Sequence, residues 1–248
     1  MDKGARSMIS VCMATYNGEK YIREQMNSIL EQIGEEDELI ISDDLSSDKT
    51  VEIIKSYKDK RIKLYIHEDN HGFVRNFENA LVHANGDVIF LSDQDDIWMP
   101  DKVKVTIAAL DNCDFTVSDC ITINENEQVI SQSRIKDYHI KTGFWRLMIK
   151  TRYLGCCMAF RRNVLDAALP FPNNAYLMEH DLWLASVAEC YFKTSLIEKP
   201  LIKYRRHGGN VSNGGDGKGY SLPVKIYRRF YRLFCLWKIR NKIKSSNL

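Results

Sequence analysis

The chain has 248 residues, of which 44% are hydrophobic, so it can bury the core of one domain. Its seven cysteines are odd in number and include no C-x-x-C pair, so we expect reduced thiols in a cytosolic setting instead of a disulfide framework. The formal net charge is only +2, and the sequence shows neither a secretory segment nor an apolar run that could span a bilayer. Residues 1–7 are polar and are expected to form a disordered leader.

The first half of the chain alternates between strand and helix patterns. Short apolar runs predict strands at Met8–Ala14, Glu38–Ser42, Ile62–Ile66 and Val88–Leu91. Apolar residues at helical spacing predict helices at Glu19–Leu30, around Val51, Ile54 and Tyr57, at Phe73–Ala84 and at Lys102–Leu110. This alternation predicts an α/β fold with a mostly parallel, Rossmann-like sheet that helices cover on both faces.

The second half is less regular. We expect strands at Phe115–Ser118, Gly155–Phe160 and Thr194–Ile197, and helices at Asn163–Ala168 and His180–Cys190. Between these elements lie a polar hairpin or excursion at Thr122–Ile140 and a Gly- and Asn-rich loop at Arg205–Gly219. We therefore expect one domain over residues 8–222, in which residues 8–110 hold a common ligand and residues 111–222 a variable one.

The segment VIFLSDQDDIWMP, residues 88–100, places three carboxylates directly after a buried strand. Asp93, Asp95 and Asp96 repel one another unless a cation lies among them. Alternate side chains of an extended backbone point the same way, so Asp93 and Asp95 can face one ion. Oxygen ligands suit Mg²⁺ or Mn²⁺, and open α/β sheets bind ligands outside the carboxyl ends of their strands. The alternative is a solvated acidic turn or a helix N-cap cluster.

Polar residues also follow the first two predicted strands, at Thr15–Asn17 and at Asp43, Asp44, Ser46 and Asp48. Three strand ends on one rim converge on one crevice, where a carboxylate can accept hydrogen bonds from a nucleotide base or ribose. The alternative makes Asp43 and Asp48 turn and cap residues, and for Asp48 we prefer it. The glycine-rich motifs of dinucleotide enzymes and P-loops are absent from the sequence, so a bound diphosphate would need a metal and a cation such as Arg75.

Two polar clusters mark the second half. Glu179, His180 and Asp181 precede an apolar helix, where a carboxylate is either an N-cap or a general base that faces the crevice. Further on, residues 204–210 form a basic loop that could close over phosphates. In this loop His207 is either a further metal ligand or simply exposed.

Several segments together carry a resemblance to a known family: TYNGEKYIREQMNSIL, ISDDLSSDKT, NHGFVRNFENAL with NGDVIFLSDQDDIWMPDKV, HDLWLASVA and YRRHGGNVS. They span roughly residues 8–212 and resemble, in the family's order, the family-2 inverting glycosyltransferases. The combination SDQDDIW, HDLW and YRRHGGNVS is similar to bacterial rhamnosyltransferase-like members. The resemblance implies the GT-A fold, with a nucleotide-binding half at residues 8–110 and an acceptor-binding half at residues 111–222.

Carried over residue by residue, the resemblance implies a nucleotide site at Thr15, Tyr16, Asn17, Asp43, Asp44, Arg75 and Asp93. It implies that Mn²⁺ or Mg²⁺ is held by Asp95, Asp93 and His207. Asp181 takes the place of the catalytic base, although this chain has Glu-His-Asp where many members have a Glu-Asp pair, so Glu179 stays open as the base. The acceptor and phosphate side would include Glu179, His180, Arg205 and Arg206.

The resemblance implies an inverting transferase that moves a sugar, rhamnose by preference, from a dTDP- or UDP-linked donor. The acceptor would be a polyprenyl-linked saccharide in cell-surface polysaccharide synthesis. An aspartate would remove the proton of the acceptor hydroxyl during one metal-assisted displacement. The alternatives are a nucleotidyltransferase, which should carry a glycine-rich segment after its first strand, and a non-catalytic nucleotide-sugar-binding module.

The C-terminal segment, residues 223–248, predicts a basic amphipathic helix. Its apolar stripe consists of Ile226, Phe230, Leu233 and Trp237, and the opposite side carries Lys225, Arg228, Arg229 and Arg232. Such a helix is typical of an anionic membrane interface, which would place the protein on the cytoplasmic face of the cell membrane. The alternative is a helix that packs its stripe on the domain. No nucleic acid is expected as a partner, because the basic residues are confined to this segment and no recognition motif accompanies them.

Overall fold

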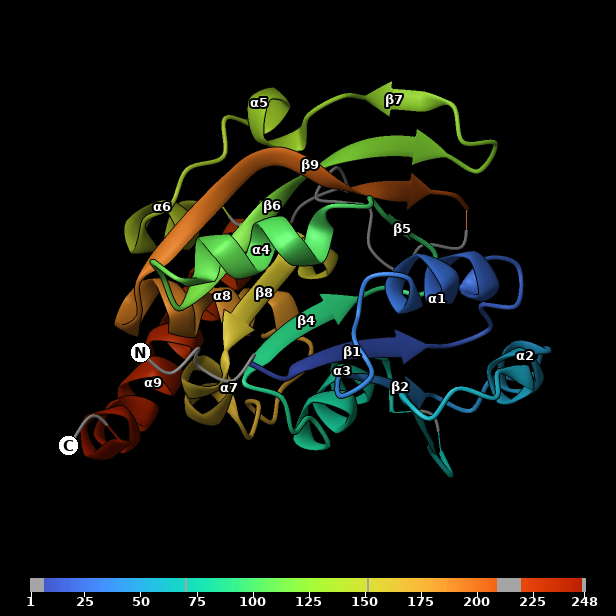
Figure 1. The fold of residues 1–248 in the computed structure, drawn as a ribbon. Coiled ribbons are helices and arrows are strands. Elements are labelled where there is room, and N and C mark those ends of the chain that lie inside the picture. Colours follow the sequence, from blue (N-terminus) through green and yellow to red (C-terminus); the bar gives the residue numbers. More distant parts are fainter. Residues whose placement is uncertain (1–6, 70, 151, 209–219, 247–248) are drawn as a thin grey trace, which may run out of the picture.

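The computed structural model describes residues 7–69, 71–150, 152–208 and 220–246. In these residues the strands form one sheet in the order β3-β2-β1-β4-β8-β6-β9-β5, with β7 paired to β6 (Figure 1). Residues 1–6 of the expected leader and residues 209–219 of the expected basic loop lie outside the described residues.

The first half of the sheet is parallel. It consists of β1 (Ile9–Thr15), β2 (Glu38–Asp43), β3 (Ile62–Ile66) and β4 (Val88–Ser92). Strand β1 lies between β2 and β4, and the parallel register places the ends of all three strands at one edge of the sheet. Every residue of β2 and β4 is buried, as is usual for parallel strands that are covered on both faces.

The second half of the sheet is mixed. It consists of β5 (Ile97–Trp98), β6 (Phe115–Asn124), β7 (Val129–Ser131), β8 (Met158–Arg161) and β9 (Thr194–Arg206). Strand β8 is antiparallel to both of its neighbours, β4 and β6, and so joins the two halves. Strand β9 runs parallel to β6 along its length, and β5, which follows the acidic turn, pairs antiparallel with it. Figure 1 shows β9 as a long curved strand above β4 and β8.

Helices cover both faces of the sheet, as predicted. On one side lie α1 (Ile22–Leu30), α2 (Thr50–Ser56) and α4 (Lys102–Leu110). Helix α4 packs on β6, β8 and β9, and α1 contacts α2 and β5 (Figure 1). The predicted α/β fold is therefore confirmed.

The other side holds α3 (Phe73–Val82), which packs on β1 and β2, and a cluster formed by α6 (Phe144–Ile149), α7 (Arg162–Ala168), α8 (His180–Tyr191) and α9 (Leu222–Ser246). The short helix α5 (Arg134–Tyr138) packs beside β6. A 3₁₀ turn at Gly155–Cys157 leads into β8. Helix α8 is the centre of this side, because it contacts α3, α6, α7 and α9.

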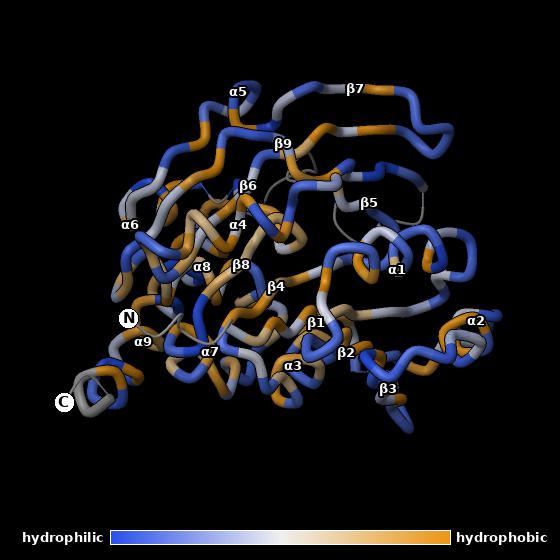
Figure 2. Tube along the Cα trace, viewed as in Figure 1, coloured by the Kyte–Doolittle hydropathy of each residue, from blue (hydrophilic) through white to orange (hydrophobic). Residues whose placement is uncertain are grey.

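The core lies between the sheet and these helices. Hydrophobic residues concentrate along the inner strands and on α4 in Figure 2, while the outer turns are hydrophilic. Trp183 of α8 is fully buried, and its indole N–H donates to the carbonyl of Ala168 at 2.8 Å, which fixes α8 against α7. The backbone approaches closely where the chain enters β4, since a Cβ on Gly86 would lie 2.6 Å from the backbone nitrogen of Ser10.

The strands of the second half differ most from the prediction. Strand β6 continues to Asn124 and β9 to Arg206. The loop that was expected to begin at residue 205 therefore begins only after residue 206. The two strands extend because they pair with each other, with register shifts near Asp119 where Pro200 faces it. The expected strand over Gly155–Phe160 starts only at Met158, after the 3₁₀ turn.

Candidate active site

The ends of β1 and β2 form one wall of the site. Thr15 donates its hydroxyl to Oδ2 of Asp43 at 2.8 Å, and Asp43 also accepts hydrogen bonds from the amide and hydroxyl of Ser46. Asp44 accepts hydrogen bonds from the amides of His71 and Gly72, each at 2.8 Å. Both carboxylates are buried, so they order the loops at the rim of the crevice.

The turn after β1 contacts the acidic turn directly. Gln94 accepts a hydrogen bond from the amide of Tyr16 and donates one to its carbonyl, each at 2.9 Å. Gly18 is required beside this pair, because a Cβ there would collide with the Gln94 amide. The side-chain oxygen of Asn17 accepts hydrogen bonds from Ser47, whereas the Tyr16 ring is half exposed at the rim.

The expected capping role of Asp48 is borne out by its contacts. Its Oδ1 accepts a hydrogen bond from the amide of Thr50, the first residue of α2, at 2.9 Å. Its Oδ2 accepts one from the amide of Glu19. Asp48 therefore holds two backbone amides, and we assign it a structural role.

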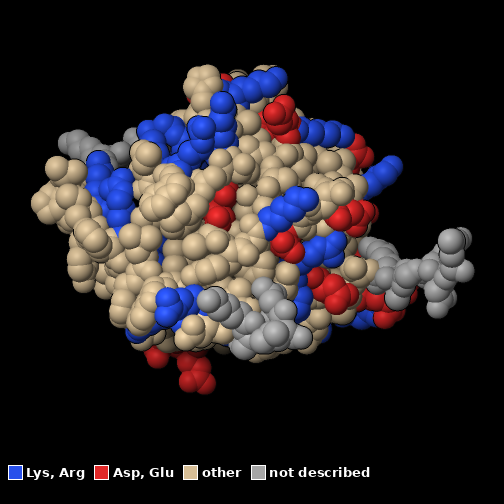
Figure 3. Space-filling view, turned by 90° about the vertical axis from the view of Figure 1, so that its left-hand side faces the viewer, with Lys and Arg blue, Asp and Glu red and all other residues tan. Residues whose placement is uncertain are grey.

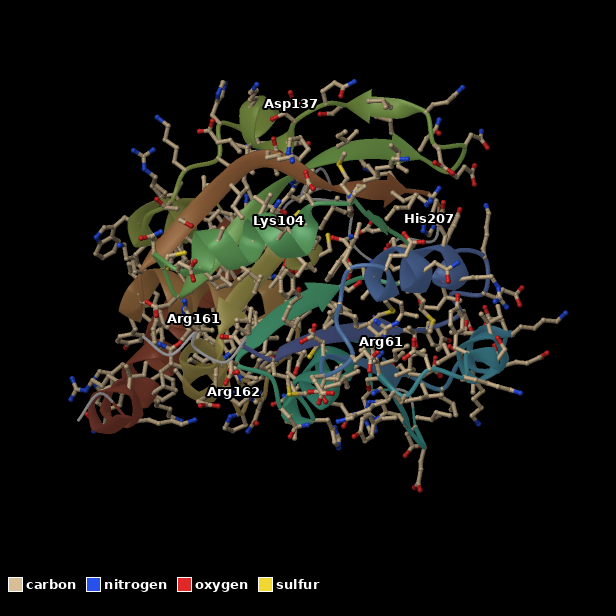
Figure 4. The ribbon with its side chains drawn as sticks, in the orientation of Figure 1. Arg61, Lys104, Asp137, Arg161, Arg162 and His207 are labelled. Carbon is tan, nitrogen blue, oxygen red and sulfur yellow. The ribbon has the colours of Figure 1, made fainter. Side chains whose placement is uncertain are left out.

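The carboxylates of the acidic turn form two separate groups. Oδ2 of Asp95 lies 2.8 Å from Nε2 of His207, which follows the end of β9. The ligand atoms of Asp93, Asp96 and Cys156 lie within 4.8 Å of one another. Asp93 and Asp95 were expected to face one ion from an extended backbone, but residues 93–96 bend after β4 ends, because Gln94 turns back to the β1 loop. Figure 4 shows His207 beyond the end of β9, above α1.

The electrostatics of the turn favour a cation. Burial, together with the negative charges of Asp95 and Asp181, raises the pKa of Asp93 to about 8. Burial and the charges of Asp95 and Asp93 raise the pKa of Asp96 as well, and its Oδ2 is buried without a hydrogen-bond partner in the described residues. Carboxylate oxygens beside an imidazole nitrogen match the ligand preferences of Mn²⁺, so these side chains fit a divalent metal.

Arg205 is part of strand β9 and hydrogen-bonds the acidic turn. Its side chain is buried, its amide donates to Oδ1 of Asp96, and its Nε donates to the backbone carbonyl of Asp95, both at 2.9 Å. The guanidinium pairs with Glu24 at 2.7 Å and lies over the ring of Tyr21. The expectation that Arg205 and Arg206 belong to a flexible loop is wrong, because both residues pair with β6 as part of β9.

The start of α8 carries the expected base. Burial raises the pKa of the Asp181 carboxyl to about 6, although the charges of Arg228 and Arg134 act in the opposite direction. Because the charges of Asp181 and Asp93 interact, the start of α8 and the acidic turn border the same region. Glu179 accepts a hydrogen bond from Arg228 of α9 at 3.1 Å, so its carboxylate is already partnered.

His180 and Arg75 were predicted to contact substrate, and the structure gives both of them other contacts. The His180 ring is buried and stacked on Phe77 at 4.0 Å, and burial lowers its pKa to about 3. It therefore packs as a neutral core aromatic, so an acceptor role for His180 has no support in this packing. Arg75 forms an ion pair with Glu78 and donates to the carbonyl of Pro172 at 2.9 Å.

The sequence analysis did not identify the residues that link the acidic turn, the end of β9 and the start of α8. Gln94 and Cys156 stand beside predicted ligands, and Glu24 and Tyr21 lie on or next to α1 and hold Arg205 and His207. Arg134, whose charge acts on Asp181, lies in the stretch expected to be a polar excursion. Only Gln94, which lies inside the acidic motif, left a signal in the sequence.

Comparisons with known proteins show the family to which the chain is similar. The chain matches the model of Glycosyl transferase family 2 over residues 10–169. The dTDP-rhamnosyl transferase RfbG of Shigella flexneri is 31% identical, and the match covers 95% of this chain and 83% of RfbG. The UDP-Glc:alpha-D-GlcNAc-diphosphoundecaprenol beta-1,3-glucosyltransferase WfgD of Escherichia coli is 28% identical, with 83% and 80% covered.

Solved structures share the fold. Residues 1–349 of S. aureus TarS, in complex with UDP-GlcNAc, give a TM-score of 0.70 at 23% identity and cover 90% of this chain and 64% of that chain. The mannosyltransferase PcManGT from Pyrobaculum calidifontis, in complex with GDP-Man and Mn²⁺, gives 0.59 at 20% identity, with 79% and 56% covered. The chain thus spans less than two thirds of these solved chains. Together with the family match, they confirm the expected GT-A fold.

The contacts of Arg205 predict a stability effect. We expect Arg205→Met to lower the free energy of unfolding by roughly 1–3 kcal/mol, because the carbonyl of Asp95 and the carboxylate of Glu24 lose their charged donor. Urea unfolding followed by circular dichroism measures the change. Lys203→Met is the matched control on β9, since its ion pair with Glu127 is exposed. Equal midpoints for the two variants would contradict the role of Arg205.

Proposed function

The chain belongs to glycosyl transferase family 2, and we propose that it moves a sugar from a nucleotide diphosphate sugar to a hydroxyl of a lipid-linked saccharide. The observation that carries this proposal is that a candidate base and a candidate metal site lie close together. Asp181, whose pKa burial raises to about 6, stands at the start of α8, and its charge acts on the acidic turn that fits a divalent metal. A base and a cation site are the two requirements of this transfer.

Asp181 is our choice for the base. A carboxyl with a pKa near 6 is mostly ionised at neutral pH and is still basic enough to accept a proton from an acceptor hydroxyl. Glu179 is the weaker choice, because its carboxylate is held by Arg228 and is partly exposed. The acceptor oxygen then attacks the face of the sugar opposite to the diphosphate, so one displacement inverts the anomeric carbon without an enzyme nucleophile.

Asp95 and His207 would hold the metal, and Asp93, whose charge interacts with that of Asp95, would add to the negative charge around it. When bound, Mn²⁺ or Mg²⁺ would neutralise the charge that develops on the leaving diphosphate. The relative PcManGT, which binds GDP-Man with Mn²⁺, supports this choice of ion. Arg205 orients Asp95 through the backbone carbonyl, and Tyr21 packs against the His207 ring at 4.9 Å.

The nucleotide would lie along the ends of β1 and β2. Tyr16 offers a half-exposed ring at the rim, and Thr15, Asn17, Asp43 and Asp44 order the loops around it. For the donor we favour dTDP-rhamnose, with a UDP-sugar second, because RfbG is named as a dTDP-rhamnosyl transferase and TarS binds UDP-GlcNAc. The name of WfgD supports a diphosphopolyprenol-linked acceptor.

Replacement of the base tests the proposed reaction. The wild-type protein with Mn²⁺ should transfer rhamnose from dTDP-rhamnose, and Asp181→Asn should lower the rate by about 10²–10⁴. Glu179→Gln is the matched control and should keep most of the activity. The wild-type kcat/KM should fall as the pH drops below about 6, because protonated Asp181 cannot accept a proton. Normal turnover by Asp181→Asn would refute the assignment, and a wild-type protein that binds the donor without turnover would favour a non-catalytic module.

The metal ligands give a second prediction. EDTA should abolish transfer, and added Mn²⁺ should restore it. Asp95→Asn should raise the Mn²⁺ concentration needed for half-maximal binding at least about tenfold, measured by calorimetry without substrate. Asp111→Asn, at an exposed carboxylate remote from the turn in sequence, should bind Mn²⁺ like the wild type. Transfer that is indifferent to chelation would count against a metal.

Helix α9 supports attachment to a membrane surface. Phe230 is 67% exposed and Trp237 55% exposed, and Ile226 and Leu233 of the same stripe are also exposed. The alternative that this stripe packs on the domain is therefore wrong. Arg228 and Arg232, expected on a solvent-facing basic side, are buried instead, and they bond Glu179 and the carbonyl of Leu147. No helix in the described part of the chain is long and apolar enough to cross a bilayer.

We therefore place α9 in the interface of an anionic membrane, on the inner face of the cell membrane where a lipid-linked acceptor is available. The exposed stripe is flanked by basic side chains that remain on the surface: Lys225, Arg229, Lys238 and Arg240. Such a face combines apolar insertion with attraction to anionic lipid head groups. Arg228 and Arg232 hold the helix to the domain, so the stripe faces outward.

Point variants of the stripe test membrane attachment without removing α9, whose inner face contributes to the core. Phe230→Ser combined with Trp237→Ser should weaken binding to vesicles that contain phosphatidylglycerol at least about tenfold, since each buried aromatic contributes roughly 1.5–3 kcal/mol. Val129→Ser with Ile130→Ser, at exposed apolar residues of β7, is the control pair. Vesicle sedimentation measures both pairs, and unchanged binding of the first would retire the proposal.

A further inference from the structure

A pocket with a basic lining lies between α5 and α6, apart from the crevice at the strand ends. Its volume is about 150 Å³, and we call it the basic pocket after its cationic residues, His139, Lys141, Arg146, Lys150 and Arg152. No ion pair joins any of these five side chains to a carboxylate in the described part of the chain. Five basic groups around one small cavity create a positive potential that attracts an anion.

A carboxylate borders the wall of the pocket, but its hydrogen bonds go to groups of the wall and not to the basic side chains. Glu189 of α8 accepts a hydrogen bond from the Tyr153 hydroxyl at 2.6 Å and from the amide of Gly143 at 2.8 Å. Its two oxygens are thus engaged in holding the wall. Figure 3 shows Lys and Arg side chains gathered on the upper part of the side that carries α6. The lysine and arginine side chains of the basic pocket match a phosphate or diphosphate group, whose oxygens accept hydrogen bonds from both.

The basic pocket adjoins the surface that we place on the membrane. On α6, Trp145 is 73% exposed and Ile149 is 74% exposed, and they alternate with Arg146 and Lys150 of the pocket. Helix α9 holds this end of α6, because Arg229 donates to the carbonyls of Met148 and Ile149 at 2.8 and 2.9 Å. An anionic group in the pocket could therefore carry a hydrocarbon chain that continues along exposed apolar side chains.

The basic pocket also leads toward the catalytic base. The guanidinium of Arg152 lies 4.6 Å from the centre of the Tyr138 ring, and Arg134 lies 4.6 Å from the same ring. Arg134 is near enough to the start of α8 for its charge to act on Asp181. Tyr138, with an arginine on either side, thus separates the pocket from the base region. A ligand anchored by phosphate in the pocket would reach toward Asp181 with its sugar.

We infer that the basic pocket binds the diphosphate of a polyprenyl-linked acceptor, with Arg146, Lys150 and Arg152 as its main ligands. This inference rests on the proposed function, since it assigns a site to the acceptor of that reaction. The saccharide lies on the side of Asp181, the diphosphate lies in the pocket, and the polyprenyl chain follows Trp145 and Ile149 into the lipid. The pocket then selects acceptors by their charge and sets the distance between that charge and the attacked sugar.

The test compares charge removal in the basic pocket with the same charge removal elsewhere. Arg146→Gln with Lys150→Gln should raise KM for a diphosphate-linked lipid acceptor about tenfold or more, because two charge-assisted contacts are lost. With a phosphate-free saccharide acceptor, kcat/KM should not change. Lys60→Gln with Lys104→Gln is the control pair, since both lysines are exposed and the change in net charge is equal. Arg146→Lys with Lys150→Arg should retain a KM close to that of the wild type.

Direct binding separates this inference from the proposed function. Calorimetry with inorganic pyrophosphate in EDTA should show that binding to the pocket pair is about tenfold weaker than to the wild type or the control pair, even if no transfer is detected. Equal pyrophosphate affinities would overturn the inference. Equal losses with both acceptors would also overturn it, because they would place the effect in catalysis. A loss confined to phosphatidylglycerol vesicles, with an unchanged acceptor KM, would assign the pocket to phospholipid head groups instead.

Discussion

Three carboxylates within four residues, all near the end of a buried strand, are the constraint that organises this site. Their mutual repulsion is tolerated because positive groups and donors surround them. Arg205 donates its amide to the Asp96 carboxylate and its Nε to the backbone carbonyl of Asp95, and His207 bonds the Asp95 side chain. Lys102, a buried ammonium that lies 4.9 Å from the Trp98 ring, adds a positive charge beneath the turn. The remaining negative charge fits the divalent cation that we propose here, and it includes an oxygen of Asp96 that has no hydrogen-bond partner among the described residues.

The same constraint explains why two distant parts of the chain meet. The acidic turn belongs to the nucleotide half, but its supports come from the last residues of β9, more than 100 residues later. Strand β9 reaches the turn because it pairs with β6 along its length and accepts β5 as its other neighbour. In this way one strand, which begins shortly after α8 ends, links the helix whose start carries the proposed base to the acidic turn.

The sequence predicted the first half well, because its strands are buried on both faces and its helices are strongly amphipathic. Apolar runs marked β1 to β4 to within a residue or two, and the polar residues after them marked the rim. Strand β6 was predicted too short, since the polar residues that continue it are stabilised by pairing with β9 and β7, which are distant or weakly patterned in the sequence. For Arg205 the composition of its neighbours suggested a loop, and nothing local showed that Glu24 and Tyr21 would bury it. The basic pocket left no motif, because its lysines, arginines and histidine are scattered over residues 139–152 and line one cavity only in the folded chain.

Arg228 links helix α9 to the region of the proposed active site. It lies on the inner face of the helix that we place at the lipid surface, and it bonds Glu179, two residues before the proposed base. The C-terminal helix is thus a structural part of the catalytic domain and not a detachable tether. A shortened protein that ends before α9 would lose a support of the active site together with its attachment, so the soluble form of choice for crystallisation keeps the helix and changes only its outward aromatic residues.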